Sequence, residues 1–172
     1  MYRTLPYTGL FAVTVLLQVF LFDNLSVSIY LNPLVYIAFL ALLPLDTKPV
    51  ALLGAGLLLG VVMDYAMGAA GINTIATLLI AFLRPALVNL LFGQENAKEG
   101  GIPSANRMGQ RTFIRYLLLL TLIHHTAFFL LEALSWSRLP LTVLRIAAST
   151  LLTAAFLWLI ARIFNSKLPS RL

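Results

Sequence analysis

Six apolar stretches, separated by short polar turns, make up most of this 172-residue chain and limit its fold more than any other feature. A helix needs about 20 mostly apolar residues to cross a bilayer, and the stretches come near that length. We therefore predict an all-α integral membrane protein with about six transmembrane helices and one membrane domain covering residues 1–172. The predicted spans are residues 5–22, 31–45, 50–67, 72–92, 113–134 and 139–164.

Composition narrows the possible functions. Hydrophobic residues are 60% of the chain and charged residues only 10%, which leaves no room for a separate soluble catalytic domain. The net charge of the chain is +6. In so apolar a chain, the excess of Lys and Arg is more typical of residues that set the orientation in the membrane than of a nucleic-acid-binding surface. Cysteine is absent, so disulfides, thiol nucleophiles and thiolate metal sites are excluded. We find no phosphate-binding loop or nucleophile elbow, and we predict a non-enzymatic protein without a metal or cofactor.

The basic residues predict the orientation, because Lys and Arg accumulate in short cytoplasmic loops. If the six spans alternate in direction, ten basic residues fall on one side and two on the other. The ten are Arg3, Lys48, Arg84, Lys98, Arg107, Arg111, Arg115, Arg162, Lys167 and Arg171, and the two are Arg138 and Arg145. We expect both termini in the cytoplasm, together with a mobile loop at residues 93–112.

Proline affects where the helix begins or breaks in two of the predicted spans. Asn32 and Pro33 open the second span, where Asn can cap the helix and Pro can occupy its first turn. Pro85 follows Arg84 in the fourth span, and proline disfavours helical geometry in the residue before it. Either a kinked helix runs over residues 72–92, or the span ends at Arg84 and an interfacial helix begins. We favour the second reading, since it places Arg84 among the lipid headgroups.

Ionisable residues within spans are costly and therefore mark candidate sites. Asp64, Glu132 and Arg145 lie at similar depth near the predicted outer surface, and Asn73 begins the fourth span there. These four residues could form one polar cluster. Its simplest explanation is a structural salt bridge between Glu132 and Arg145, and the alternative is a site for a ligand or a partner.

Glycines mark a second candidate site. Gly56, Gly60 and Asp64 share one helical face at four-residue spacing, and Gly68 and Gly71 follow in a turn. Glycines at this spacing allow close approach of another helix within lipid. Packing within the chain is the first explanation, with a homodimer face or a partner contact as alternatives.

His124 and His125 lie near the middle of the fifth span, and His125 shares a face with Glu132. A metal site would need further ligands at convergent positions, which the sequence does not supply. We expect His125 to hydrogen-bond to Ser149 or Thr153 of the sixth span. A proton relay through His125 and Glu132 is the functional alternative.

The order of these features resembles the rod-shape-determining MreD family of bacterial inner-membrane proteins. The resemblance depends on residues 17–22, on Leu31-Asn32-Pro33, and above all on the block from Gly56 through Asp64, Gly68 and Gly71 to Arg84. It implies a fold similar to the S components of energy-coupling-factor vitamin transporters. No catalytic role attaches to the matching residues.

The resemblance also implies partners and a location. It places the chain in the bacterial inner membrane, as a scaffold of the cell-elongation machinery that supports cell shape and lateral peptidoglycan synthesis. The direct partner would be a bitopic MreC-like protein, with indirect links to MreB-like filaments, RodA and a penicillin-binding transpeptidase. Because the predicted loops are small, we expect this partner to pack on the helix face of Gly56 and Gly60 or on the first span. A small-molecule transport subunit is the alternative function, and an intramembrane enzyme ranks third.

Overall fold

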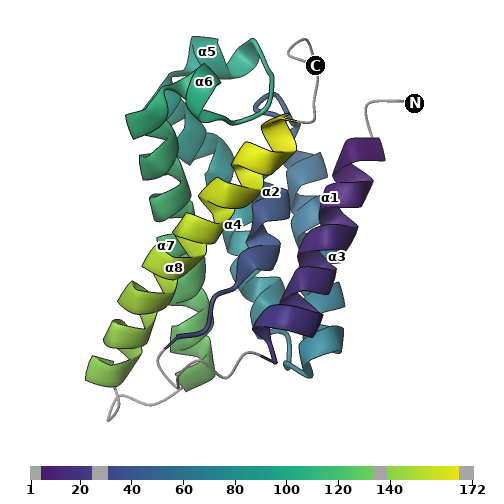
Figure 1. Ribbon diagram of the computed structural model, residues 1–172, viewed down its shortest axis with the longest axis vertical. Coiled ribbons are helices and arrows are strands. Elements are labelled where there is room, and N and C mark those ends of the chain that lie inside the picture. The colour runs from purple at the N-terminus through teal and green to yellow at the C-terminus, as the bar shows by residue number, and fades with distance from the viewer. Residues whose placement is uncertain (1–4, 25–30, 134–138, 167–172) are drawn as a thin grey trace.

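Helices form along nearly all of the apolar stretches in the computed structural model of the protein (Figure 1). The structure describes residues 5–24, 31–133 and 139–166. The helical elements are α1 (Leu5–Leu16), the π-helix η1 (Leu17–Phe22), the 3₁₀-helix η2 (Val35–Ile37), α2 (Ala38–Leu42), α3 (Pro49–Met67), α4 (Ile72–Phe92), α5 (Gln94–Lys98), α6 (Ala105–Met108), α7 (Gln110–Ala133) and α8 (Leu139–Ser166).

Four of these helices, α3, α4, α7 and α8, are long and apolar enough to cross a membrane. This agrees with the prediction of an all-α membrane protein. The first predicted span forms the shorter apolar helix Pro6–Phe22, in which η1 continues α1. The second predicted span does not form a spanning helix.

The segment from residue 31 to 45 is the main departure from the predicted fold. We expected a helix starting at Asn32 and Pro33, but the only helical parts are η2 and the five-residue α2. Every residue from 33 to 43 is buried, and α2 lies in the middle of the assembly among the longer helices (Figure 1). Non-helical backbone is tolerated at membrane depth where protein surrounds it, and this segment meets that condition.

Helix α4 corrects a second prediction. We favoured a break at Arg84 and Pro85, yet α4 runs without interruption from Ile72 to Phe92 with Pro85 inside it. Arg84 is 1% exposed. It therefore lies within the protein and not among the headgroups, as the preferred reading had placed it.

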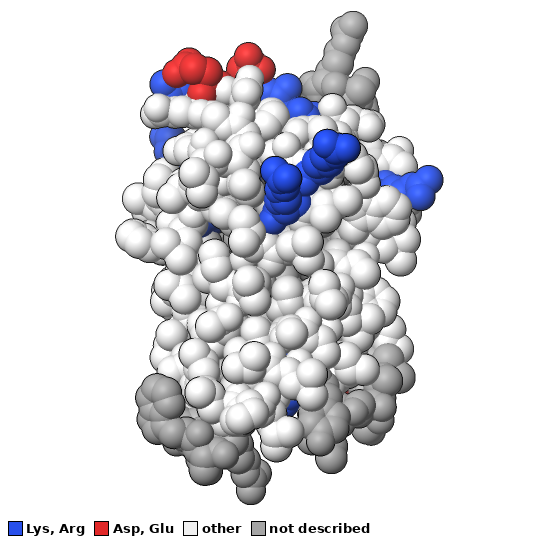
Figure 2. All heavy atoms as spheres, turned by 90° about the vertical axis from the view of Figure 1, so that its left-hand side faces the viewer, with Lys and Arg blue, Asp and Glu red and all other residues white. Residues whose placement is uncertain are grey.

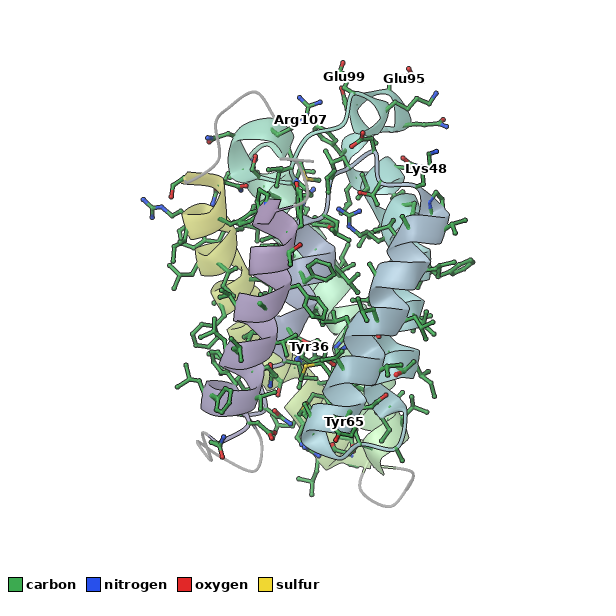
Figure 3. All side chains as sticks on the ribbon, turned by 90° about the vertical axis from the view of Figure 1, so that its right-hand side faces the viewer. Tyr36, Lys48, Tyr65, Glu95, Glu99 and Arg107 are labelled. Carbon is green, nitrogen blue, oxygen red and sulfur yellow. The ribbon has the colours of Figure 1, made fainter. Side chains whose placement is uncertain are left out.

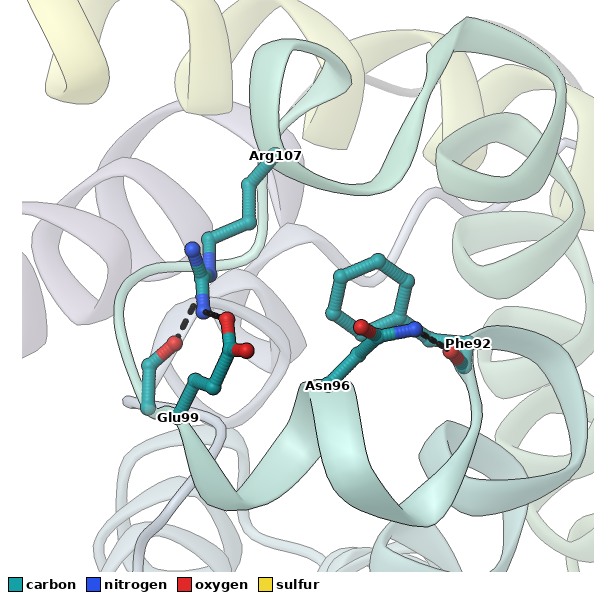
Figure 4. Close-up of polar contacts among 5 residues, drawn as sticks. Phe92, Asn96, Glu99 and Arg107 are labelled. Atoms are coloured by element: carbon teal, nitrogen blue, oxygen red, sulfur yellow. Dashed lines mark hydrogen bonds and ion pairs between the residues drawn. The ribbon is translucent and has the colours of Figure 1, made fainter.

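Residues 93–112 form a folded connection, in contrast to the mobile loop that we expected. The connection contains α5 and α6, and Leu45 N–H donates a hydrogen bond to the carbonyl of Gly101 at 2.9 Å. Arg107 pairs with Glu99 at 3.1 Å and also donates to the carbonyl of Gly100, while Asn96 donates to the carbonyl of Phe92 (Figure 4). These contacts fix the connection across the end of the helix assembly.

Charged side chains gather at that same end. On the face drawn in Figure 2, nearly all basic and acidic side chains lie in the upper half, and the lower half is almost uncharged. Lys48, Glu95, Glu99 and Arg107 lie at one end of the molecule and Tyr65 at the other (Figure 3). The beginning of α1 and the end of α8 lie at the charged end too (Figure 1). We call these the charged end and the opposite end.

Candidate functional site

The interior holds many polar side chains, including Gln18, Asn73, Arg84, His124 and His125, each at most 1% exposed. A buried polar group costs free energy unless it forms hydrogen bonds. The partners of these side chains therefore indicate whether they serve the fold or remain available to a ligand.

At the start of the broken segment 31–45, side chains from two other elements replace helical hydrogen bonds. Gln18 of η1 accepts a hydrogen bond from Val35 N–H at 2.7 Å and donates one to the Pro33 carbonyl at 3.2 Å. From α8, Ser149 Oγ accepts from Asn32 N–H at 3.1 Å and Thr153 Oγ1 accepts from Leu34 N–H at 3.2 Å. The extended backbone is thus supported from both sides.

At the end of the same segment, Arg84 of α4 donates to three oxygen atoms. Its Nε lies 2.9 Å from the hydroxyl of Tyr116, and its two terminal nitrogens donate to the carbonyls of Leu43 and Pro44. Tyr116 in turn donates to the carbonyl of Ala41 at 2.8 Å. A cation at these carbonyls is favourable because the C-terminus of a helix carries partial negative charge.

Asp64 caps the next helix across the turn that joins α3 to α4. Its carboxylate accepts hydrogen bonds from the backbone N–H groups of Asn73 at 2.9 Å and Thr74 at 3.0 Å, and from both of their side chains. The turn itself needs Gly68 and Gly71, whose φ angles are 65° and 89°. The bonding pattern accounts for the carboxylate as a helix cap.

A hydrogen-bonded chain runs inward from this cap. Tyr36 donates its hydroxyl proton to Asn73 Oδ1 at 2.7 Å, and its oxygen lies 3.1 Å from His124 Nε2. Since the hydroxyl donates to the Asn73 oxygen, the histidine is the donor in the second bond and carries its proton on Nε2. The chain therefore connects α4, η2 and α7.

His125 has a partner on each ring nitrogen. Nδ1 lies 2.9 Å from the carbonyl of Thr121, which only accepts, so Nδ1 carries the proton. Nε2 then accepts from Thr153 Oγ1 at 3.1 Å. This confirms the predicted hydrogen bond to α8, and the same Thr153 supports Leu34 of the broken segment.

Glu132 and Arg145 form the predicted salt bridge, with 2.9 Å between Oε2 and a terminal guanidinium nitrogen. The Arg145 guanidinium carbon also lies 4.7 Å from the centre of the Phe129 ring. The expected cluster of four residues thus separates into two pairs: Asp64 bonds with Asn73, and Glu132 bonds with Arg145. Among the bonds of the described residues, none joins the two pairs directly.

The glycine face of α3 packs within the chain. A Cβ added to Gly56 would lie 2.8 Å from Ala81 Cβ, and one added to Gly60 would lie 2.4 Å from Thr74 Cα. Thr77 of α4 also donates to the carbonyl of Gly56 at 2.9 Å. A partner helix cannot pack on this face without displacing α4, which corrects one of the two contact surfaces we expected for the partner.

Several residues of this network were not singled out from the sequence as parts of a site, namely Tyr36, Thr74 and Tyr116. Gln18 was noted only as a polar residue within the first span. The capping role of Asp64 could have been predicted from the sequence. A carboxylate that precedes Asn73 and Thr74 by one glycine-containing turn is well placed to cap the helix that they begin. For Tyr116 the sequence has no such signal.

Comparison with known proteins leaves the family open. No protein-family model matches the chain. No curated protein matches it, and no solved structure does.

Proposed function

We propose that this protein is a non-enzymatic membrane scaffold of the bacterial cell-elongation machinery, of the MreD type, that binds a bitopic MreC-like protein through a lipid-facing helix surface. The charged end faces the cytoplasm in this proposal, as the bias in basic residues predicts. MreB-like filaments, RodA and a penicillin-binding transpeptidase would join the assembly through the bitopic partner.

The observation that carries the proposal is that the buried polar groups form structural hydrogen bonds and an ion pair within the chain. Asp64 caps α4, Arg84 and Gln18 support the broken segment, and Glu132 pairs with Arg145. Each suspected functional side chain thus has a structural partner within the chain. Recognition by the outer faces of the helices is consistent with this arrangement.

The outer face of α3 is the surface we assign to the partner. Its exposed residues recur at helical spacing along the whole helix, and they include Val50, Gly54, Leu57, Leu58, Val61 and Tyr65. A Cβ added to Gly54 would have nothing within 4 Å. A single-span helix could therefore approach the α3 backbone closely at Gly54, as small residues allow in lipid.

Co-purification in detergent tests the identity of the partner. The tagged protein is expected to recover the host's MreC-like protein together with RodA and the penicillin-binding transpeptidase. A single-span protein with a scrambled transmembrane sequence serves as the control. Recovery of the scrambled protein at the same level, or no recovery of the MreC-like protein by a well-folded sample, would contradict the proposal.

Gly54→Leu tests the surface. This variant adds volume only on the exposed face, so it is expected to reduce partner recovery at least tenfold without loss of folding. Ala147→Leu is the matched control, because Ala147 is an exposed small residue on α8. Leucine at Gly56 or Gly60 would instead separate α3 from α4 and so would test folding, not partner binding.

A transport subunit remains the second candidate, because broken helices often form substrate sites in transporters. The segment 31–45 has this character, but its bonds with Gln18, Ser149, Thr153, Arg84 and Tyr116 already occupy the backbone groups that a ligand would use. Saturable binding of a vitamin-like solute that is abolished by Arg145→Gln would favour transport over scaffolding.

A further inference from the structure

An apolar groove lies between α7 and α8 on the outside of the helix assembly. Its volume is about 380 Å³, and its walls include Ile114 and Leu118 of α7 and Leu151, Ala154 and Ala155 of α8. The small side chains of the two alanines on α8 leave space opposite the larger side chains of α7. Gln110 and Trp158 also line the groove.

A second, polar cavity of about 510 Å³ adjoins the groove, since Gln110 and Trp158 line both. Hydrogen-bonding side chains line it together with apolar ones, and they include Asn106, Arg162 and Asn165, whose amide also donates to the carbonyl of Pro103 at 3.4 Å. Among the residues that the structure describes, no Asp or Glu lines this cavity. An anion would therefore meet donors and positive charge there without a repelling carboxylate.

Arg162 lines the polar cavity next to Trp158, which lines both cavities. Its guanidinium carbon lies 5.6 Å from the centre of the Trp158 ring, a favourable position for a cation over an aromatic face. Tryptophan and arginine at this depth are typical of the membrane–water interface. A guanidinium group is also well suited to phosphate, which it can bind through two parallel hydrogen bonds.

We propose that the groove and the cavity together bind one anionic glycerophospholipid. An acyl chain lies in the groove between α7 and α8, and the phosphate lies beside Arg162 and Asn106. Charge complementarity selects the occupant: the polar cavity is lined by residues of α6 and of the last turns of α8, which lie at the charged end of the molecule (Figure 1). The apolar groove adjoins the cationic cavity, just as the acyl chains of such a lipid adjoin its phosphate headgroup.

Quenching of Trp158 by brominated lipids tests the proposal in nanodiscs that contain the full-length protein. The background substitution Trp136→Phe leaves Trp158 as the only tryptophan. Two samples have the same mixture of phosphatidylglycerol and phosphatidylcholine, with bromine on the acyl chains of one lipid or of the other. We expect the anionic lipid to associate about fivefold more strongly, which corresponds to one basic residue near the membrane surface.

Arg162→Gln is expected to abolish the preference between the two lipids. Arg115→Gln, at an exposed arginine of α7 outside both cavities, is expected to preserve it. Ala155→Phe fills the groove and is expected to reduce quenching by the anionic lipid, whereas the matched control Ala147→Phe leaves it unchanged.

Three results would overturn the proposal. The first is equal quenching by both lipids in the protein with Arg162 intact. The second is the same loss of preference in Arg115→Gln and Arg162→Gln, which would indicate general attraction to the membrane. The third is complete displacement of the lipid by inorganic phosphate, which would identify a phosphate site without a role for the acyl chain.

Discussion

The α3–α4 hairpin and the segment 31–45 are both held in place by contacts within the chain, but the interactions differ in kind. In the hairpin, the backbones of α3 and α4 approach closely at Gly56 and Gly60. In the segment 31–45, the regular helix is interrupted, and side chains from η1, α4, α7 and α8 bind its backbone groups. The hairpin depends on the absence of side chains at Gly56 and Gly60. The segment 31–45 depends on hydrogen-bonding side chains of the surrounding elements.

This contrast means that the two regions should respond to opposite kinds of substitution. Added volume should damage the hairpin, because its helices have no space between them at the glycines. Loss of a hydrogen-bonding group should damage the segment 31–45, because an unpaired backbone group inside the membrane costs several kcal/mol. The predictions below test the contrast, from the largest expected effect to the smallest.

Arg84→Leu is expected to have the largest effect. It removes the donor to the carbonyls of Leu43 and Pro44, and hydrogen bonds to charged groups are worth about 1.5–3 kcal/mol each. We expect the free energy of unfolding to fall by about 4 kcal/mol, measured by steric trapping in bicelles. The exposed Arg115→Leu is the control, and equal stability of the two variants would contradict the role assigned to Arg84.

Gly60→Ala tests the hairpin. The new Cβ would lie 2.4 Å from Thr74 Cα, so the helices must separate, at a cost of about 3 kcal/mol in the free energy of unfolding. Gly54→Ala on the same helix should instead raise stability by about 0.5–1 kcal/mol, because alanine favours the helix and meets no neighbour there. The same thermal midpoint for both variants would show that the close approach of α3 and α4 has no energetic consequence.

Gln18→Leu tests the first part of the broken segment. Leucine preserves most of the volume but leaves Val35 N–H and the Pro33 carbonyl without their partner. The expected loss is about 2 kcal/mol in the free energy of unfolding, again by steric trapping. Gln94→Leu, at an exposed glutamine of α5, should have little effect, and a similarly small effect at Gln18 would refute the supporting role.

Asp64→Asn is expected to have the smallest effect of the four, about 1–2 kcal/mol, as for loss of a helix cap. The amide retains one acceptor oxygen where the carboxylate has two. Hydrogen exchange should accelerate at the backbone N–H groups of Asn73 and Thr74, which Asp64 now protects. Unchanged protection at these two groups, or the same change in the exposed control Asp46→Asn, would rule out the capping role.

The sequence predicts the long helices well, because a run of apolar residues that fills the bilayer has few alternatives to a helix. The predicted ranges 50–67, 72–92 and 139–164 lie within two residues of the ends of α3, α4 and α8. The sequence also predicts the ion pair of Glu132 with Arg145 and the hydrogen bond of His125 with Thr153. Each pair follows from helical spacing in two helices that are close together in the sequence.

The broken segment could not be predicted in the same way. Apolar residues at 31–45 satisfy a buried helix and a buried extended chain equally, so periodicity does not distinguish them. The position of Arg84 depends on this break, because its partners Leu43 and Pro44 are 41 and 40 residues away along the chain. The cost of a charge in lipid therefore suggested a headgroup position for a side chain that the protein itself surrounds.

One measurement tests the central claim, that the polar interior serves the fold and the outer face of α3 serves the partner. It compares recovery of the MreC-like protein by Gly54→Leu with recovery by the double variant Glu132→Gln and Arg145→Gln, at equal amounts of folded protein. We predict that Gly54→Leu loses the partner and that the double variant retains it. Loss of the partner in the double variant, with full recovery by Gly54→Leu, would contradict the claim and assign recognition to the polar residues.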